Sequence, residues 1–371
     1  MPEDIGRMED LSATDRERLT QTGLEVGMKN RSGSFFQVDQ EIKQVAALEE
    51  GIEVLSIQDA LAKYGWLEDY SWNLVRKDKD QYTRFVADQP DPRGFVIIAR
   101  KGSRTVFPLQ TCLFLAKTPV QHVHNIIIAE EGAELHLISG CASASYTKTG
   151  SHIGVSEFYV GRNARITTTM IHNWGDEISV FPRSAARVEE NGVFLSNYVC
   201  MQPVRKIQMS PVADLAGKNS VARFSSIVVC TPGSHMDLGS VARLSEEGAS
   251  AELITRAITT GGTIISRGMI EGKTRHTKGH IECKGLILKD GIIHAIPEIK
   301  GDVVDTELSH EAAVGKIAKD EIEYLMSRGL DEDVATSTII RGFLDVKIAG
   351  LPESLQNQID AAIDSAEKSG F

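Results

Sequence analysis

The sequence predicts a mainly β protein, folded as a solenoid of the parallel β-helix type and flanked by helical segments at both ends. Between about residues 95 and 305, short runs of β-branched and aromatic residues alternate with turn residues. In the same region, a Gly or Asn recurs at nearly even intervals, each time before an alternating strand. Helical periodicity is confined to the segments before and after this region. These observations favour coils of short strands over a simple sandwich or a fold with crossover helices.

Residues 1–90 are expected to form an N-terminal helical domain. Ser56 and Asp59 have the spacing of a capping box, and apolar positions at helical spacing follow them. The segment 88–94 contains two prolines and a glycine, which predict a break before the β region.

The β region, residues 95–305, is expected to form the solenoid itself. Its clearest strands are four runs bounded by turn residues: 95–99, 124–128, 156–160 and 226–230. The recurring turn residues, nearly evenly spaced along the chain, are Gly132, Asn163, Gly192, Asn219 and Gly248. A turn that recurs in this way is typical of a solenoid in which each coil stacks on the one before. The alternative is a coincidence among residues that are frequent in turns.

Residues 306–371 are expected to form a C-terminal helical domain. A first helix over 320–328 has apolar residues on one face and ends at Gly329, a typical residue after a helix. Asp331 opens a second helix with an acidic first turn. Pro352 marks the start of a third, whose apolar positions keep helical spacing.

Composition argues against several classes of protein. The 371 residues carry 40 Lys and Arg against 51 Asp and Glu, a formal charge of −11, which argues against nucleic-acid binding. No stretch approaches about 18 uninterrupted apolar residues, so no membrane span is expected. The first residues lack the apolar core of a signal peptide, which predicts a cytoplasmic protein. The five cysteines, an odd number without a CxxC motif, do not suggest a disulfide framework.

Soft and borderline metal ligands are scattered through the β region. They are Cys141, Cys200, Cys230 and Cys283, at or near strands, and His294, His310 and Glu311, near the C-terminal end. Thiolate and imidazole favour iron–sulfur or zinc centres, and a carboxylate can complete an iron site. In a solenoid, residues one coil apart in sequence become neighbours in space. The alternative for each cysteine is an ordinary buried core residue.

Other histidines allow two interpretations. His122 and His124 alternate on one strand and share a face, which suits either a metal or a polar surface toward solvent. His276 and His280 lie in or beside a segment rich in Lys, Arg and Gly, which is expected to form a solvated turn. A partial HExxH metalloprotease motif begins at His310 but has valine in place of its second histidine.

Two motifs near the C-terminal end resemble a known family. Residues 308–317 read Leu-Ser-His-Glu-Ala-Ala-Val-Gly-Lys-Ile, and residues 323–330 read Glu-Tyr-Leu-Met-Ser-Arg-Gly-Leu. Three further groups follow the family's order: Ser139-Gly140-Cys141, His152 with Ser156-Glu157, and His172-Asn173-Trp174. Over about residues 95–350 the chain therefore resembles the SufB/SufD family, scaffold subunits of the SUF iron–sulfur cluster assembly system, and it is closer to SufB.

The resemblance implies a right-handed parallel β-helix flanked by helical domains. It also implies a homodimer or a SufB/SufD-type heterodimer formed through the β-helix. A SufC-type ABC ATPase is expected to bind the C-terminal helices. Sulfur would arrive as persulfide, and a transient cluster, expected as 4Fe-4S, would be built at the dimer interface and passed to recipient apo-proteins.

Carried over by position, the resemblance assigns roles to several residues. Cys200 resembles the sulfur-accepting cysteine, and Arg205 and Lys206 follow closely enough in sequence to lower its pKa if they also lie close in space. His310 and Glu311 resemble the His/Glu pair near the assembly site. Cys283 and His294 resemble residues of the penultimate strands.

One position departs from the family pattern. The assembly cysteine of the Cys-x-x-His motif falls on Gly291 here. Cys283 is the substitute candidate for a cluster ligand, with Glu298, His310 and Glu311 as possible partners. The sequence thus predicts a non-enzymatic scaffold that relies on its partner for ATP hydrolysis. The alternative is a SufD-like structural subunit that binds no cluster, and a secreted β-helix enzyme acting on polysaccharide is disfavoured by the absence of a signal peptide.

Overall fold

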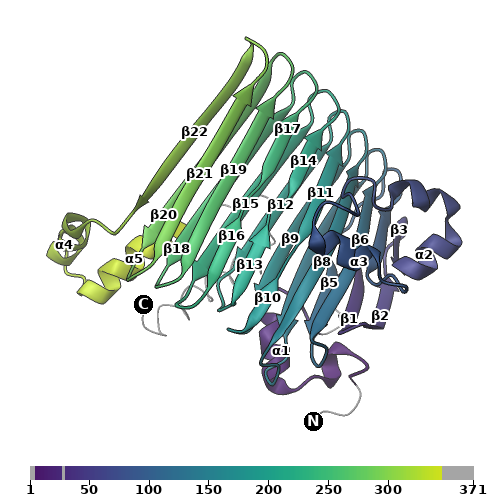
Figure 1. The fold of residues 1–371 in the computed structure, drawn as a ribbon, viewed down its shortest axis with the longest axis horizontal. Helices are drawn as coiled ribbons and strands as arrows, with labels where there is room; N and C mark the ends of the chain where they lie inside the picture. The colour runs from purple at the N-terminus through teal and green to yellow at the C-terminus, as the bar shows by residue number, and fades with distance from the viewer. Residues whose placement is uncertain (1–4, 27–29, 345–371) are drawn as a thin grey trace.

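The computed structural model describes residues 5–26 and 30–344. In this range the chain forms a β-solenoid of about eight coils with helices at both ends, which confirms the predicted fold class (Figure 1). Each coil contributes strands to two long sheets. Both sheets run the length of the solenoid, and side chains from both line the core.

The strands of the two sheets follow the chain from the first coil to the last. Sheet A contains, in spatial order, β2 (Glu41–Ala47), β1 (Gly33–Val38), β5 (Leu109–Leu115), β7 (Glu134–Ser143), β9 (Arg165–Asn173), β12 (Val193–Cys200), β15 (Val221–Cys230), β18 (Ser250–Thr259), β20 (Thr277–Ile287) and β22 (Thr306–Gly315). Sheet B contains β10 (Ile178–Val180), β13 (Lys206–Met209), β16 (His235–Leu238), β19 (Thr263–Gly272), β17 (Val241–Leu244), β14 (Val212–Leu215), β11 (Arg183–Val188), β8 (Gly150–Val160), β6 (Val120–Ala129), β4 (Phe95–Ala99) and β3 (Ile52–Ser56), with β21 (Ile292–Gly301) beside β19.

Parallel pairing in continuous register holds the coils together. Ser250 of β18 pairs with Lys278 of β20, and Thr277 of β20 pairs with Thr306 of β22, so each strand pairs with the equivalent strand of the next coil. At the N-terminal end, β1–β2 and β3–β4 pair antiparallel instead. The solenoid is therefore closed by hairpin-like pairing at its first coil and ends in parallel strands at its last.

The predicted repeat of turn residues is confirmed and has a conformational cause. Gly132, Asn163, Asn219 and Gly248 have φ values of 70°, 56°, 56° and 73°. In the remaining turn the left-handed residue is Asn191, with φ 53°, one position before the expected Gly192. Gly and Asn adopt this conformation at the lowest cost, which explains why these residue types recur.

The same turns also stack on one another. The amides of Gly132, Asn163 and Asn191 each donate to a carbonyl of the following turn, at 2.8–2.9 Å. Asn191 Nδ2 donates to Asn163 Oδ1 at 3.0 Å, and Asn219 Nδ2 donates to Asn191 Oδ1 at 3.4 Å. The asparagines thus form a ladder along this edge.

Charges of opposite sign alternate along the ladder. The ion pairs are Lys101–Glu131, Arg162–Glu190, Lys218–Glu247 and Arg275–Asp305, with N···O distances of 2.8, 3.5, 3.5 and 3.9 Å. Each exposed pair contributes little stability by itself. Because a slip of one coil would oppose like charges, the alternation favours the observed register.

The interior is a continuous apolar core that extends along the solenoid. Alternate residues of each strand point inward, as strand geometry requires. The rings of Phe158, Phe194 and Phe224 follow one another along the core in tilted and edge-to-face contacts, with centroids 5.1 and 5.9 Å apart. The four predicted runs all lie in strands, namely β4, β6, β8 and β15.

The N-terminal segment contains the expected helices together with strands β1–β3. The helices are η1 (Met8–Asp10), α1 (Ala13–Thr20), α2 (Ile57–Lys63), η2 (Gly65–Tyr70) and α3 (Gln81–Ala87). Ser56 is the N-cap of α2, and its hydroxyl accepts a hydrogen bond from the Asp59 amide at 3.0 Å, as the motif predicted.

A buried carboxylate anchors this segment to sheet B. Glu157 accepts hydrogen bonds from the amides of Trp72, Leu74 and Val75 at 2.6, 2.6 and 3.0 Å. It also pairs with His124 Nε2 at 2.7 Å, and the Trp72 ring covers the imidazole. The histidines of β6 share a face as expected, but that face is buried under the N-terminal segment rather than exposed to solvent.

The C-terminal segment continues the solenoid before it becomes helical. β22 extends to Gly315, beyond the expected limit of the β region, and α4 (Lys319–Ser327) and α5 (Glu332–Leu344) follow. Gly329 has φ 97°, as expected of a residue after a helix. The helix expected after Pro352 lies outside the described residues. The division into three domains stays a prediction. Among the described helices, none has the length and apolar character required to cross a bilayer.

Asn191→Ala is expected to lower the free energy of unfolding by about 1 kcal/mol, because alanine adopts a left-handed conformation at a cost and breaks the ladder. Asn191→Gly, which keeps the backbone freedom but lacks the amide, is expected to stay within about 0.5 kcal/mol of the wild type. Urea unfolding monitored by circular dichroism measures both. Equal losses in the two variants would show that the turn conformation is not the cause.

Candidate functional site

The last coils of the solenoid carry most of the predicted ligands, and strand alternation separates them onto different faces. Cys283 of β20 points into the core, and its Sγ lies 3.7 Å from the Ser266 hydroxyl. His310 of β22 is the register partner of the buried Ile281 and lies on the same side of sheet A, but at the end of the solenoid its side chain is exposed. Glu311 points to the opposite, outer face of sheet A.

Two further predicted ligands lie on the other sheet. His294 and Glu298 belong to β21, where Ala295 packs against the core. Because side chains alternate along a strand, both point to the outer face of sheet B. The structure therefore does not gather the predicted ligands into one cluster.

A different group does converge, on the outer face of sheet A. One ligand atom each from His280, Glu282 and Glu311 lies within 4.8 Å of the others. His280 and Glu282 are next-but-one neighbours on β20, and Glu282 is the register partner of Glu311 on β22. The expected solvated turn contains His276 but is shorter than expected, because β20 begins at Thr277 and includes His280.

Sequence reasoning missed His280 and Glu282, although the pattern carried a usable signal. A His-x-Glu pair on a strand shares one face. Glu311 follows Glu282 by one full period of the coil. Together with the exact number of residues in one coil, these two observations predict that His280, Glu282 and Glu311 lie close together.

Hydrogen bonds and ion pairs orient all three side chains. His280 Nδ1 lies 2.9 Å from the Ser309 hydroxyl, which leaves Nε2 for a ligand. Glu282 pairs with Arg256 and with Lys284, whose Nζ also lies 3.3 Å from Glu311 Oε1. Partial burial favours a higher pKa for Glu282, but Arg256 and Lys284 outweigh it and hold the pKa below its ordinary value. The carboxylate is therefore ionised at neutral pH.

This donor set suits a divalent cation of borderline character. Imidazole and carboxylate ligands bind Fe²⁺, Mn²⁺ and Zn²⁺, whereas a soft metal would require thiolates. Three protein ligands leave coordination positions free for a second reactant.

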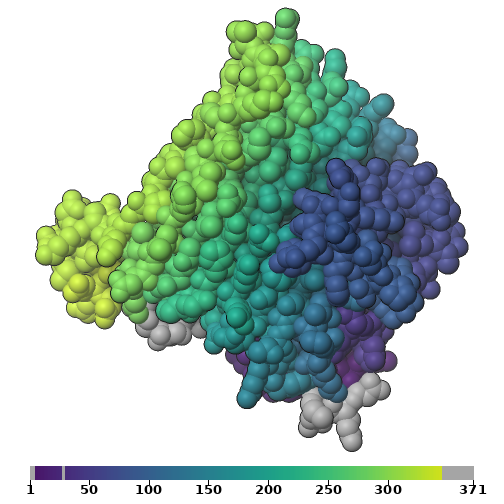
Figure 2. Space-filling model, in the orientation of Figure 1, coloured from purple at the N-terminus to yellow at the C-terminus, as the bar shows by residue number. Residues whose placement is uncertain are grey.

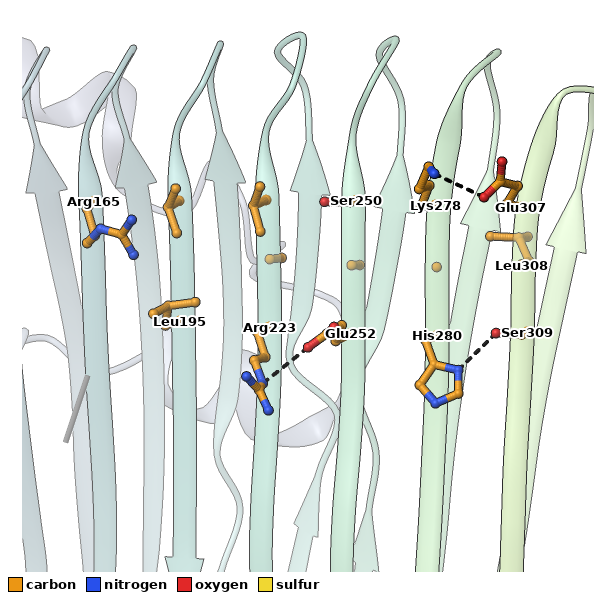
Figure 3. Close-up of a pocket in the computed structure, with 15 residues that line it drawn as sticks. Arg165, Leu195, Arg223, Ser250, Glu252, Lys278, His280, Glu307, Leu308 and Ser309 are labelled. Atoms are coloured by element: carbon orange, nitrogen blue, oxygen red, sulfur yellow. Dashed lines mark hydrogen bonds and ion pairs between the residues drawn. The ribbon is translucent and has the colours of Figure 1, made fainter. Parts of the chain in front are cut away.

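A groove of about 760 Å³ crosses the outer face of sheet A beside this group. It extends from Arg165 of β9 to Ser309 of β22, and His280 belongs to its lining. Figure 3 shows Lys278 paired with Glu307 and His280 with Ser309 along the groove. Figure 2 shows the last coils at one end of the molecule. The Glu311 side chain is 56% exposed, so the group is reached from solvent.

Cys200 lies fully inside the solenoid. Its exposed fraction is 0%, and burial raises the pKa of its thiol to about 12. Arg205 pairs with Glu177 at 3.0 Å, and Lys206 lies over the Phe181 ring. Both cations therefore have partners other than the Cys200 thiol. All five cysteines are buried and free.

A small chamber of about 50 Å³, lined by both apolar and polar side chains, lies in the core near Cys200. His172, the register partner of Cys200, lines it and has its Nδ1 2.9 Å from the Tyr198 hydroxyl. Burial lowers the pKa of His152, which also lines the chamber, to about 3, so this imidazole is neutral. His172 Nε2 has no hydrogen-bond partner within the described chain, which suits a buried water.

Gly291 is enclosed by its neighbours. A Cβ atom at this position would lie 2.3 Å from Thr259 Oγ1 and 3.0 Å from the Gly262 carbonyl oxygen. Thr259 is buried and donates a hydrogen bond to the same carbonyl at 2.8 Å. The coil is therefore built around glycine and has no space for a cysteine side chain without rearrangement.

The fold and site together define a β-solenoid protein with a candidate metal centre on its last coils. Residues 113–343 match the family model described as the SufBD core domain of SUF system FeS cluster assembly. An iron–sulfur cluster assembly SufBD family protein of Archaeoglobus fulgidus is 48% identical over 355 residues, covering 95% of each chain. A SufBD family protein of Methanothermobacter thermautotrophicus (strain Winter) is 42% identical over 372 residues, covering 99% of this chain and 91% of the relative.

The chain belongs to the SufBD family, and its role lies in SUF iron–sulfur cluster assembly. A more distant member from Staphylococcus aureus is 30% identical over 267 residues, which is 70% of this chain and 57% of the relative. These relatives carry the joint SufBD name, so the closer likeness to SufB stays a prediction.

The native protein is expected to resist thiol alkylation. Iodoacetamide at pH 8 should leave Cys200 unmodified under conditions that fully label glutathione, because the reactive species is the thiolate. In concentrated guanidinium chloride all five cysteines should react. Mass spectrometry of peptides identifies the sites, and rapid labelling of Cys200 in the native protein would contradict its burial.

The raised thiol pKa values also predict a loss of stability at high pH. Unfolding returns Cys141, Cys200 and Cys230 from a pKa of about 12 to the ordinary value of 9.0. The unfolded chain then releases these protons first, so stability is retained below pH 9 and falls as the pH rises toward 12. Melting temperatures of the wild type and a Cys230→Ala variant across this range measure the effect. The variant should show a shallower decline.

Proposed function

We propose that the chain is the scaffold subunit on which iron–sulfur clusters are assembled, acting with a SufC-type ATPase. The observation that carries the proposal is the convergence of His280, Glu282 and Glu311 on the last coils of a SufBD family member. Iron is the substrate that these side chains receive. ATP hydrolysis belongs to the partner, so the chain itself is not an enzyme.

The donor set suits transient rather than permanent binding of iron. Carboxylates and one imidazole hold Fe²⁺ less tightly than four thiolates hold a finished cluster. Cys283 follows Glu282 directly and is the thiol nearest this group in sequence, while His310 lies on the same side of sheet A as Cys283. Sulfur delivered to Cys283 would therefore enter from the core side of the strand that carries the iron ligands.

The remaining predicted residues fit the proposal less directly. His294 and Glu298 face away from sheet A, so they would contribute to a cluster only from the other face of the last coil. Cys200 would accept persulfide sulfur only after an opening of the solenoid, because its thiol is buried and protonated. The product is expected to be a transient 4Fe-4S cluster, transferred to recipient apo-proteins in the cytoplasm.

The free edge of the last coil supports dimer formation. β22 ends the spatial order of sheet A and spans ten residues, Thr306–Gly315, so one of its edges has no partner strand within the described chain. Long exposed edges pair readily with strands of another chain. Pairing here, as a homodimer or with a SufD-type partner, would place Glu311 near the interface.

The C-terminal helices support binding of the ATPase. α4 and α5 project beside the last coil (Figure 1), and α4 exposes Tyr324 and Met326. Exposed apolar side chains on a projecting helix are typical of an interaction surface. We propose that the SufC-type ATPase binds there.

A structural subunit that binds no cluster is the second candidate, and two observations favour it. Gly291, the position to which the resemblance carries the family's assembly cysteine, is packed against Thr259. All five thiols are buried. In this case the chain would complete the ATPase complex while another subunit carried the cluster.

Reconstitution distinguishes the two candidates. The chain is purified anaerobically with its ATPase, and iron, acid-labile sulfide and visible absorption are measured. Glu282→Gln and Glu311→Gln are expected to reduce bound iron about tenfold at limiting iron, because each removes a charged ligand. Cys283→Ala is expected to reduce sulfide.

Glu307→Gln is the matched control, since Glu307 lies on the same strand and face as Glu311 but outside the ligand group. Its iron content should equal that of the wild type. An iron-free wild-type complex that still binds the ATPase would support the structural subunit. If neither Cys283→Ala nor Glu311→Gln changes the cluster content, the assigned site is rejected.

A further inference from the structure

Lys284 lies between the two carboxylates of the proposed iron site. Its Nζ is 3.3 Å from Glu282 Oε1 and 3.3 Å from Glu311 Oε1. An ammonium is a compact cation on a flexible stem. It therefore occupies a position that a metal ion shared by the two carboxylates would also favour.

The charges around the site are balanced before any metal arrives. Glu282 and Glu311 contribute two negative charges, and Arg256 and Lys284 contribute two positive ones. A divalent cation entering this network would meet two resident cations. Because like charges at this separation repel, one of them has to move for the metal to bind well.

The surroundings of the two cations show which one can move. The Arg256 side chain is 14% exposed and pairs with Glu282 on the neighbouring strand β20. The Lys284 side chain is 33% exposed and lies beside the last strand, β22, so its stem can extend toward solvent. Arg256 is therefore a fixed partner of Glu282, and Lys284 is the exchangeable one.

We propose that Lys284 is the exchangeable counter-ion of this site, whose ammonium competes with the metal for Glu282 and Glu311 and so sets how readily iron is released. The inference rests on the proposed function and adds a residue that controls affinity without being a ligand. When Lys284 swings out, the carboxylates accept the metal. When it returns, it replaces the metal and promotes transfer of iron to the growing cluster.

The chain contains a matched control for this role. Lys278 lies on the same strand and the same outer face, and its Nζ pairs with Glu307 at 3.1 Å. Lys278 and Lys284 thus each connect β20 to β22 by an ion pair. Lys284 alone of the two contacts members of the ligand group.

Titration of the purified full-length chain with Mn²⁺, followed by electron paramagnetic resonance, tests the inference without sulfide or ATPase. Lys284→Gln is expected to bind Mn²⁺ about three- to tenfold more tightly than the wild type, because two partly exposed ion pairs no longer compete. Lys284→Arg keeps the charge and should show no gain. Lys278→Gln should bind as the wild type does.

The outcomes separate this inference from the proposed function. If Glu282→Gln and Glu311→Gln weaken Mn²⁺ binding but Lys284→Gln leaves it unchanged or weaker, the counter-ion role is rejected and the metal site stands. If neither carboxylate variant affects binding, both the site and the role of Lys284 are rejected. A gain in affinity cannot arise from general damage to the fold, so it would support the competition directly.

Discussion

The register between successive coils is the constraint on which the rest of the structure depends. Each strand pairs in parallel with the equivalent strand of the next coil, so residues distant in sequence become direct neighbours. Glu282 and Glu311 meet for this reason alone. Left-handed turn residues such as Asn191, which stack on the equivalent residue of the neighbouring coil, fix where each strand begins and so disfavour a shift of one residue between strands. A change in the number of residues at one turn would shift this register and separate Glu282 from Glu311. The site would then be lost even though both ligands were still present.

Strand alternation then divides the chemistry of the last coils between two environments. Inward side chains such as Cys283 are shielded from water, and this burial raises the pKa of the thiol. Outward side chains such as Glu282 reach water and cations, and ion pairs keep the carboxylate charged. Adjacent residues of one strand therefore have opposite character. This arrangement places a potential sulfur carrier and potential iron ligands next to each other in sequence while keeping them separate in space.

The two ends of the solenoid differ in how their strands are paired. The first coil is closed by antiparallel strands, and Glu157 anchors the N-terminal segment over sheet B through three backbone amides. The last coil ends in a long parallel strand with a free edge beside the projecting helices α4 and α5. The ligand group, the free edge and the helices are thus close to one another at this end, where a partner chain has access.

The sequence by itself determined the fold class, the turn repeat and the helix ends at Ser56 and Gly329, because these follow from local conformational preferences. It also indicated the family through short contiguous motifs. Tertiary structure alone decided which ligands converge, since that depends on the exact coil period and on which face each side chain occupies. His280 was placed in or beside a solvated turn, although it lies in β20. Cys283 was grouped with Glu311, although the two face opposite sides of the sheet. An approximate spacing is enough to predict a solenoid, whereas a binding site requires the register without error, because a shift of one residue exchanges the two faces of a strand.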